Sequence, residues 1–286
     1  MKLLGLTSME RTRYLIKFYY IGSDKYFGSQ RQSDFETIET QITRSLFETN
    51  YIKDIKTAGF EVASRTDKFV SARGACFSFL SEKKPILMEI NSALPRDIGL
   101  WASSEVTKDF SSRFNAIYRH YKYIFPLPEN KREKYNLKLM KKASKVFEGR
   151  HNFLNFSKRE KEDITTVRDM LLADCSKEGD YLVFNFTSQA FLRQQIRRMV
   201  AKILDVGNGI LAFDELIKMF NSEEFISYQP ADPKGLILWD IYYGDKINFT
   251  IDTKSHERMM RYFSTEFTKY SLKQKLFAIL QRDNIG

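Results

Sequence analysis

The segment Arg65-Thr66-Asp67 places a carboxylate two residues after a cation. In an extended chain, residues two apart point to the same side, so these two side chains can share one wall of a site. A carboxylate that acts as a nucleophile must be ionised, and a neighbouring cation favours that form. The alternative is a turn in which Asp67 accepts a backbone hydrogen bond and takes no part in catalysis. Asp67 is therefore a candidate catalytic carboxylate.

A second charged segment runs from Phe191 to Arg198. Apolar residues recur here at helical spacing, and Arg193 and Arg197 lie four residues apart, on one face of the predicted helix. Their stripe lies beside the apolar stripe, so one arginine could be half-buried, and a half-buried arginine needs a carboxylate partner. The alternative is a solvated cationic face.

Two further patterns are compatible with binding nucleic acid. Tyr121 follows Arg119 and His120 and precedes Lys122. Basic residues interleaved with aromatic ones occur where bases stack and phosphates are held, although aromatic residues in strands also form cores.

The second pattern is a polar loop, in which Gln30 and Gln32 follow Gly28. Glycine permits close approach of another backbone, and the two amides can donate and accept hydrogen bonds. Without other evidence, this segment is only a polar loop.

Charge and composition narrow the class of protein. The 286 residues include 46 Lys and Arg against 36 Asp and Glu, a net charge of +10 that suits a polyanionic partner or an unspecialised basic surface. Two Cys and three dispersed His make a disulfide framework unlikely and do not indicate a structural metal site. No run of apolar residues is long enough to cross a membrane, and no export signal is evident, so the cytoplasm is the expected location.

Hydrophobic periodicity predicts the elements that would position these residues. Strands are expected at 13–20, around Phe77 and Phe79, and at 119–125, 182–186 and 235–243. Helices are expected at 34–49 with Ser33 and Glu36 as a capping box, from Pro85 to Leu94, and at 135–148 and 191–206, with one or two polar helices after residue 250.

Most of these strands are apolar on one face only, which favours an α+β fold with mostly antiparallel sheets over a doubly wound parallel sheet. We divide the chain into an N-terminal α+β half, residues 1–105, which carries Asp67, and a C-terminal α+β half, residues 106–250. Residues 251–286 form a helical extension.

Five segments, in order, resemble the TruA-type tRNA pseudouridine synthases, over about residues 13–243. The matching segments are Tyr26-x-Gly28-x-Gln30-x-Gln32, Arg65-Thr66-Asp67, Phe114 to Tyr123, Phe191 to Arg197, and Ala231 to Leu238. Lys68 and Ser71 give the second motif a form that resembles the archaeal and eukaryotic branch of that family.

The resemblance implies an enzyme that isomerises uridine to pseudouridine in tRNA, in the anticodon arm at tRNA positions 38–40 for bacterial members. Asp67 would be the nucleophile and Arg197 its ion-pair partner, while Tyr121 would stack on the flipped base and Arg65 would assist flipping. Gln30 and Gln32 fall in the first motif. The resemblance also implies two halves whose sheets meet at a central cleft, a homodimer, and no cofactor or metal.

Phe69 departs from the family, which has glycine at this position. If the backbone there needs a positive φ, Phe69 strains the turn or reshapes it. This residue keeps open an alternative, a non-catalytic RNA-binding protein on the same scaffold. A hydrolase with a carboxylate nucleophile is a second alternative, but it would need a metal-binding carboxylate set or a second positioned acid.

Overall fold

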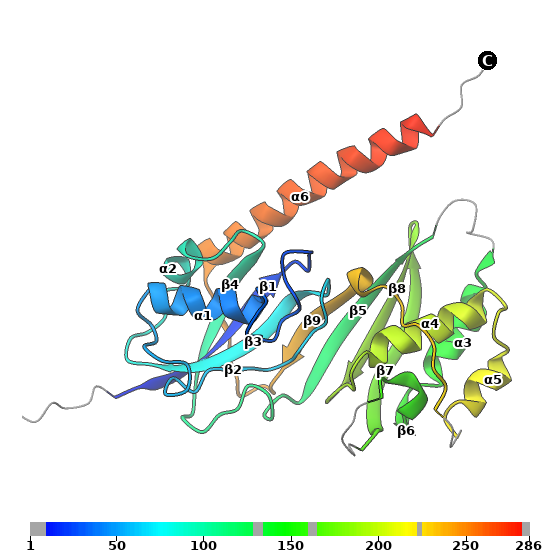
Figure 1. Ribbon diagram of the computed structural model, residues 1–286, viewed down its shortest axis with the longest axis horizontal. Helices are drawn as coiled ribbons and strands as arrows, with labels where there is room; N and C mark the ends of the chain where they lie inside the picture. Colours follow the sequence, from blue (N-terminus) through cyan, green and yellow to red (C-terminus); the bar gives the residue numbers. More distant parts are fainter. Residues whose placement is uncertain (1–9, 128–133, 160–164, 222–224, 282–286) are drawn as a thin grey trace, which may run out of the picture.

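The computed structural model describes residues 10–127, 134–159, 165–221 and 225–281 (Figure 1). Its strands are β1 Thr12–Tyr20, β2 Glu61–Val62, β3 Ser71–Ser81, β4 Ile98–Val106, β5 Tyr118–Pro126, β6 Gly149–Asn152, β7 Val167–Glu178, β8 Tyr181–Ser188, β9 Leu236–Tyr242 and β10 Thr250–Ile251. Its helices are α1 Ile38–Glu48, α2 Leu87–Ser92, α3 Leu137–Lys145, α4 Gln195–Gly207, α5 Phe213–Lys218 and α6 Thr253–Leu280, with short 3-10 turns η2 Leu154–Phe156 and η3 Pro233–Gly235.

The strands form one ten-stranded sheet in the order β10-β4-β1-β3-β9-β5-β8-β7-β6, with β2 added on β3 (Figure 1). Among the described strands, every pairing is antiparallel except that of β3 with β9. The predicted α+β class with a mostly antiparallel sheet is confirmed.

The single parallel pairing joins the two parts of the chain. Strands β4, β1 and β3 come from the N-terminal part, and β9, β5, β8, β7 and β6 come from the C-terminal part. The sheets of the two predicted halves are thus continuous with each other. The exact domain boundaries, at residues 105 and 250, stay a prediction.

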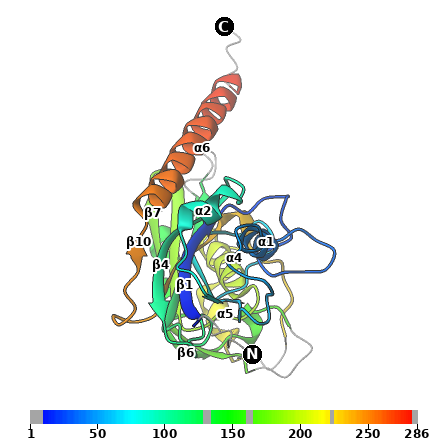
Figure 2. The same ribbon diagram turned by 90° about the vertical axis from the view of Figure 1, so that its left-hand side faces the viewer.

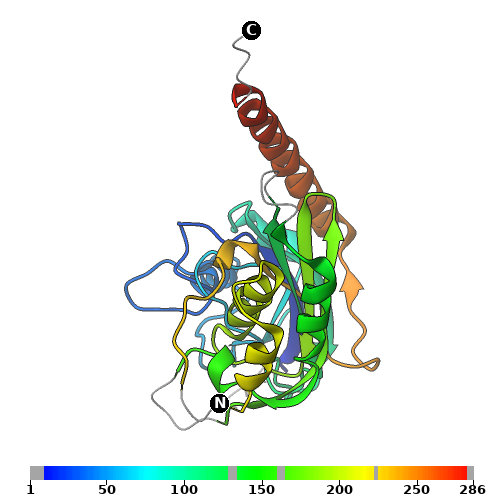
Figure 3. The same cartoon turned by 90° about the vertical axis from the view of Figure 1, so that its right-hand side faces the viewer.

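Strand β1 is buried on both faces over seven consecutive residues. One face joins the main core, and Figures 2 and 3 show α1, α4 and α5 on that side of the sheet. On the other face, Tyr19 stacks on Tyr262 and meets the edge of Phe263, both on α6. The first turns of α6 therefore cover part of the sheet that alternation alone assigns to solvent.

Helix α1 begins at Ile38, four residues later than predicted. Thr37 is its N-cap and accepts a hydrogen bond from the backbone of Thr40. The carbonyl of Glu36 instead accepts from the backbone of Phe27, and this contact holds residues 27–36 as a closed loop. The capping box predicted at Ser33 and Glu36 is wrong because a tertiary contact competes for its backbone.

Helix α4 also begins later than predicted, at Gln195. Gln194 adopts the left-handed conformation with φ 59°, which ends any continuous helix from Phe191. Arg193 lies before the helix, and its carbonyl accepts a hydrogen bond from the backbone of Lys158. The predicted helical pairing of Arg193 with Arg197 is therefore wrong.

Other predicted elements differ in their bounds. Helix α2 starts at Leu87, so Pro85 precedes it, and α3 spans only Leu137–Lys145. The periodicity did not predict β4, β6 or β7. The expected helix after residue 250 is the single helix α6, whose far end projects from the body (Figures 1 and 2).

We predict that the two ends of α6 contribute differently to stability. Met259 is fully buried, so Met259→Ala should lower the free energy of unfolding by about 2–5 kcal/mol. Ending the chain after Phe263 removes residues whose described apolar side chains are largely exposed. This truncation should change the free energy of unfolding by less than about 1 kcal/mol. Urea denaturation measures both. An equal loss in the two variants would contradict the prediction.

Candidate active site

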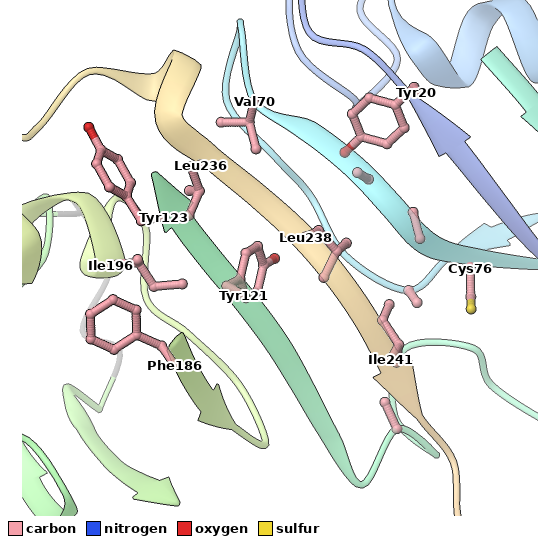
Figure 4. Close-up of a cluster of buried hydrophobic side chains, with 14 of the residues drawn as sticks. Tyr20, Val70, Cys76, Tyr121, Tyr123, Phe186, Ile196, Leu236, Leu238 and Ile241 are labelled. Carbon is pink, nitrogen blue, oxygen red and sulfur yellow. The ribbon is translucent and has the colours of Figure 1, made fainter. Parts of the chain in front are cut away.

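Because β3 and β9 pair in parallel, the loops that precede these two strands lie at the same end of the strands. Ser71 pairs with Ile237 near the start of both strands, so the chain that precedes each strand reaches the same place. One of these segments is the Asp67 loop, which we define as residues 63–70, and the other is residues 231–235. Figure 4 shows Val70, at the end of the Asp67 loop, near Leu236 of β9.

Asp67 forms an ion pair with Arg197, a residue of the first turn of α4. The distance from Nη1 of Arg197 to Oδ2 of Asp67 is 2.8 Å, and the side chains are 10% and 33% exposed. Nε of Arg197 donates to the carbonyl of Ala231 at 2.7 Å, so the guanidinium is held from two sides. The fixed cation keeps the partly exposed carboxylate in one position and faces its negative charge at hydrogen-bond distance.

Arg119 holds the base of the Asp67 loop, a role that the sequence did not reveal. Its guanidinium is buried and donates to Ser64 Oγ at 2.8 Å and to the carbonyl of Ala63 at 2.8 Å. It also donates to the carbonyls of Arg113 and Gln189. Arg119 therefore ties the loop to the ends of β5 and β8. Only its place beside Tyr121 in a basic run drew attention to it.

A second set of contacts fixes the other side of the loop. The backbone of Thr66 donates to Ser29 Oγ at 2.7 Å, and the backbone of Ser29 donates back to the carbonyl of Thr66 at 3.1 Å. A Cβ at Gly28, where φ is 93°, would lie 2.9 Å from the Thr66 carbonyl oxygen. The glycine of the first motif is thus needed for both its positive φ and this close approach.

Tyr121 projects from β5 toward the Asp67 loop. The side chain is 6% exposed, and its ring meets Phe191 edge-to-face at 5.1 Å between centroids. Burial raises the pKa of Tyr121 to about 12, against the opposing effects of Arg119 and of a hydrogen bond with Ser64. The phenol therefore stays neutral at physiological pH and presents an aromatic ring with a polar tip.

The other predicted site residues lie nearer the solvent. Arg65 is exposed on the Asp67 loop, and Gln30 is exposed on the loop at 27–36. Gln32 is also exposed and donates its side-chain amide to the carbonyl of Phe27 at 2.9 Å, so it supports the loop. Asp67, Arg197 and Tyr121 are thus brought together, whereas Arg65 and the two glutamines lie at the rim.

Phe69 occupies the strained position that the sequence suggested. The backbone of Val70 donates to the carbonyl of Asp67 at 3.2 Å and closes a turn, and Phe69 is the third residue of that turn with φ 70°. Glycine or asparagine usually occupies such a position. Gly22 leaves room for the turn, since a Cβ there would lie 2.3 Å from the carbonyl carbon of Phe69.

Within the described residues, no group of three or more His, Cys, Asp or Glu side chains is placed to hold a metal ion. Cys76 and Cys175 are both buried free thiols, and burial raises the pKa of each to about 12. No helix in the described parts of the chain has the length and apolar character needed to cross a membrane.

Asp67 is thus a carboxylate held in place by a nearly buried arginine, and sequence comparison identifies the family of the protein. The family model for tRNA pseudouridine synthase matches residues 143–244. The tRNA pseudouridine synthase A of Methanosphaera stadtmanae is 33% identical over 266 residues, 92% of this chain and 95% of that protein. The enzymes of the same name from Methanothermobacter thermautotrophicus and Pyrococcus furiosus are 34% and 32% identical, over 89% and 93% of this chain and 90% and 96% of theirs.

The chain belongs to the tRNA pseudouridine synthase family. Its likeness to solved structures is weaker. A Cbf5-Nop10-Gar1 complex contains a chain that is 12% identical with a TM-score of 0.33, covering 67% of this chain and 45% of that one, which is too distant to support an argument.

We predict that Phe69→Gly stabilises the protein. A non-glycine residue at φ 70° costs about 1 kcal/mol or more, and glycine removes that strain. Relief of this strain should raise the free energy of unfolding by about 1 kcal/mol, and loss of the ring contacts of Phe69 offsets part of that gain. Phe69→Ala is the matched control, because alanine removes the ring and keeps the strain. A glycine variant no more stable than the alanine variant would contradict the prediction.

Proposed function

We propose that this protein isomerises uridine to pseudouridine in tRNA, with Asp67 as the nucleophile. The observation that carries the proposal is the ion pair between Asp67 and Arg197, which crosses from the N-terminal to the C-terminal half in a chain of this family. The reaction breaks the bond from N1 to C1′, turns the base, and joins C5 to C1′. The hydrogen on C5 leaves to water and N1 gains a proton, so no redox partner is needed.

The residues have separate tasks in this proposal. The target uridine must leave its stack, which costs a few kcal/mol, and the exposed Arg65 occupies the vacated space and holds phosphate. Tyr121 stacks on the flipped base. Arg197 keeps Asp67 stationary whether the carboxylate attacks C1′, attacks C6 or removes a ribose proton. Gln30 and Gln32 bind at the rim.

The anticodon arm, at tRNA positions 38–40, is the proposed region of modification. We further propose that the protein acts as a homodimer in the cytoplasm. Two buried free thiols are consistent with a reducing compartment. Light scattering coupled to size exclusion would test the homodimer.

Release of tritium from tRNA labelled with [5-³H]uridine tests the reaction. The wild type should release tritium, and Asp67→Asn should release none, because the amide is neutral and no longer a nucleophile. Asp67→Asn should still bind tRNA within about tenfold, roughly 1.4 kcal/mol. Prior treatment with a chelator should leave the wild-type rate unchanged. A normal rate for Asp67→Asn would refute the assignment, and a wild type that binds without release would favour a non-catalytic RNA-binding protein.

The proposed stacking by Tyr121 predicts different effects for two substitutions. Tyr121→Ala removes the ring, and stacking is worth about 1–3 kcal/mol per base, so tRNA binding should weaken by at least about fivefold. Tyr121→Phe keeps the ring and should lose less. Filter binding measures the tRNA affinity of both variants. Urea denaturation checks that each variant remains folded, because Tyr121 is buried. An equal loss in the two variants would assign the effect to the hydroxyl.

A further inference from the structure

Five side chains form a row beside Asp67, in the order Phe35, Phe27, Lys68, Phe69, Lys234, which we call the aromatic–lysine row. The rings of Phe35 and Phe27 stack at 4.2 Å between centroids. Nζ of Lys68 lies 3.9 Å from the centroid of Phe27 and 5.1 Å from that of Phe69. Nζ of Lys234 lies 5.4 Å from the centroid of Phe69. The row thus runs from the 27–36 loop past the candidate nucleophile to the segment that precedes β9.

The row lies at the surface: its ends are exposed, and Lys68 and Phe69 between them are partly exposed. Phe27 and Phe35 are 41% and 44% exposed, and Lys234 is exposed as well. Large exposed rings that lie together contribute less to stability than buried ones and commonly mark a binding surface. The ring of Phe69 is also retained at φ 70°, where it strains the backbone. Strain that persists beside a reactive group is an indication of function.

The row is fixed relative to Asp67. Phe27 precedes Gly28 and Ser29, whose contacts with Thr66 join the 27–36 loop to the Asp67 loop. The backbone of Phe27 donates to the carbonyl of Glu36, which closes the loop that carries Phe35. A base that stacked on these rings would therefore be held at a defined distance from the carboxylate.

The chemistry of the row fits single-stranded RNA. Unpaired bases stack on aromatic rings regardless of sequence, and ammonium groups between the rings can hold the phosphates that link those bases. Beyond the row, Arg31 of the same loop lines a hollow of about 470 Å³ together with Lys53, Lys56 and Asp54. Lysines between the rings favour a partner that carries phosphates over a protein partner.

We propose that the aromatic–lysine row binds the nucleotide next to the target uridine, with its base stacked on Phe35 and Phe27 and its phosphate near Lys68 and Lys234. This inference rests on the proposed function. When the uridine flips out, its neighbour loses a stacking partner, and the row supplies a replacement. The row would therefore act in positioning and in the choice of substrate, while Asp67 performs the chemistry.

The principal test uses Phe35, which lies at the end of the row and outside the proposed catalytic group. The modified uridine is first mapped with the wild type. Transcripts are then made with an abasic nucleotide on its 5′ or its 3′ side, and kcat/KM is measured for wild type, Phe35→Ala, Phe35→Leu and Phe35→Tyr. On intact tRNA, the alanine and leucine variants should lose about tenfold, a modest value for one stacked base, and the tyrosine variant should retain near wild-type kcat/KM.

On one of the two abasic transcripts the wild type should lose a similar factor, and Phe35→Ala should lose nothing more. An alanine variant with wild-type kcat/KM on intact tRNA would overturn the inference. The inference would also be overturned if Phe35→Ala were tenfold less active than the wild type on both abasic transcripts. A structural defect would produce that result, because it does not depend on the neighbouring base. A wild type inactive on every tRNA would instead overturn the proposed function.

Two further variants test the rest of the row. Phe69→Gly should be more stable than the wild type and yet have a lower kcat/KM, a combination that a purely structural ring does not produce. Lys234→Gln should weaken tRNA binding and reduce the salt dependence of log Kd by about one ion, whereas the matched control Lys177→Gln, on the exposed end of β7, should not. Equal effects of the two lysine substitutions, or a fully active Phe69→Gly, would contradict the proposal.

Discussion

The parallel pairing of β3 with β9 is the constraint on which the candidate site depends. Every other pairing of the described strands is antiparallel, so only here do two paired strands run in the same direction. The loops that precede two paired parallel strands lie next to each other, because both strands begin at the same end of the sheet. One loop brings Asp67, and the other brings the Ala231 carbonyl that holds Arg197. The ion pair between the halves is a consequence of this register.

Two arginines then convert that meeting point into a rigid polar site. Arg119 is satisfied by backbone carbonyls and one hydroxyl, and it holds the Asp67 loop without neutralising the carboxylate. Arg197 pairs with the carboxylate itself. Planar guanidinium groups suit both tasks because several donors leave one centre in fixed directions. The site is thus organised before any substrate arrives, which is how an enzyme avoids reorganisation during reaction.

Several features that break local rules lie around this site. Phe69 has a positive φ, and the start of α4 is preceded by left-handed Gln194. Exposed rings at Phe27 and Phe35 lie close by. Elsewhere in the core, buried apolar residues follow the strand and helix patterns. Backbone strain and exposed rings beside a reactive group are expected where a binding surface has a cost in stability.

The sequence by itself determined the strands with clear alternation, the α+β class, the motifs and the candidate residues Asp67, Arg197 and Tyr121, because periodicity and residue type are local properties. It could not predict the start of α1 or α4, since the contacts of Glu36 and the turn at Gln194 decide them. Strands β4, β6 and β7 were not predicted, and the first five residues of β4 are all buried, so its sequence lacks a clear alternation. Only the tertiary structure decided the role of Arg119, the continuity of the sheet and the aromatic–lysine row. These features depend on contacts between residues far apart in the chain, which no local pattern encodes.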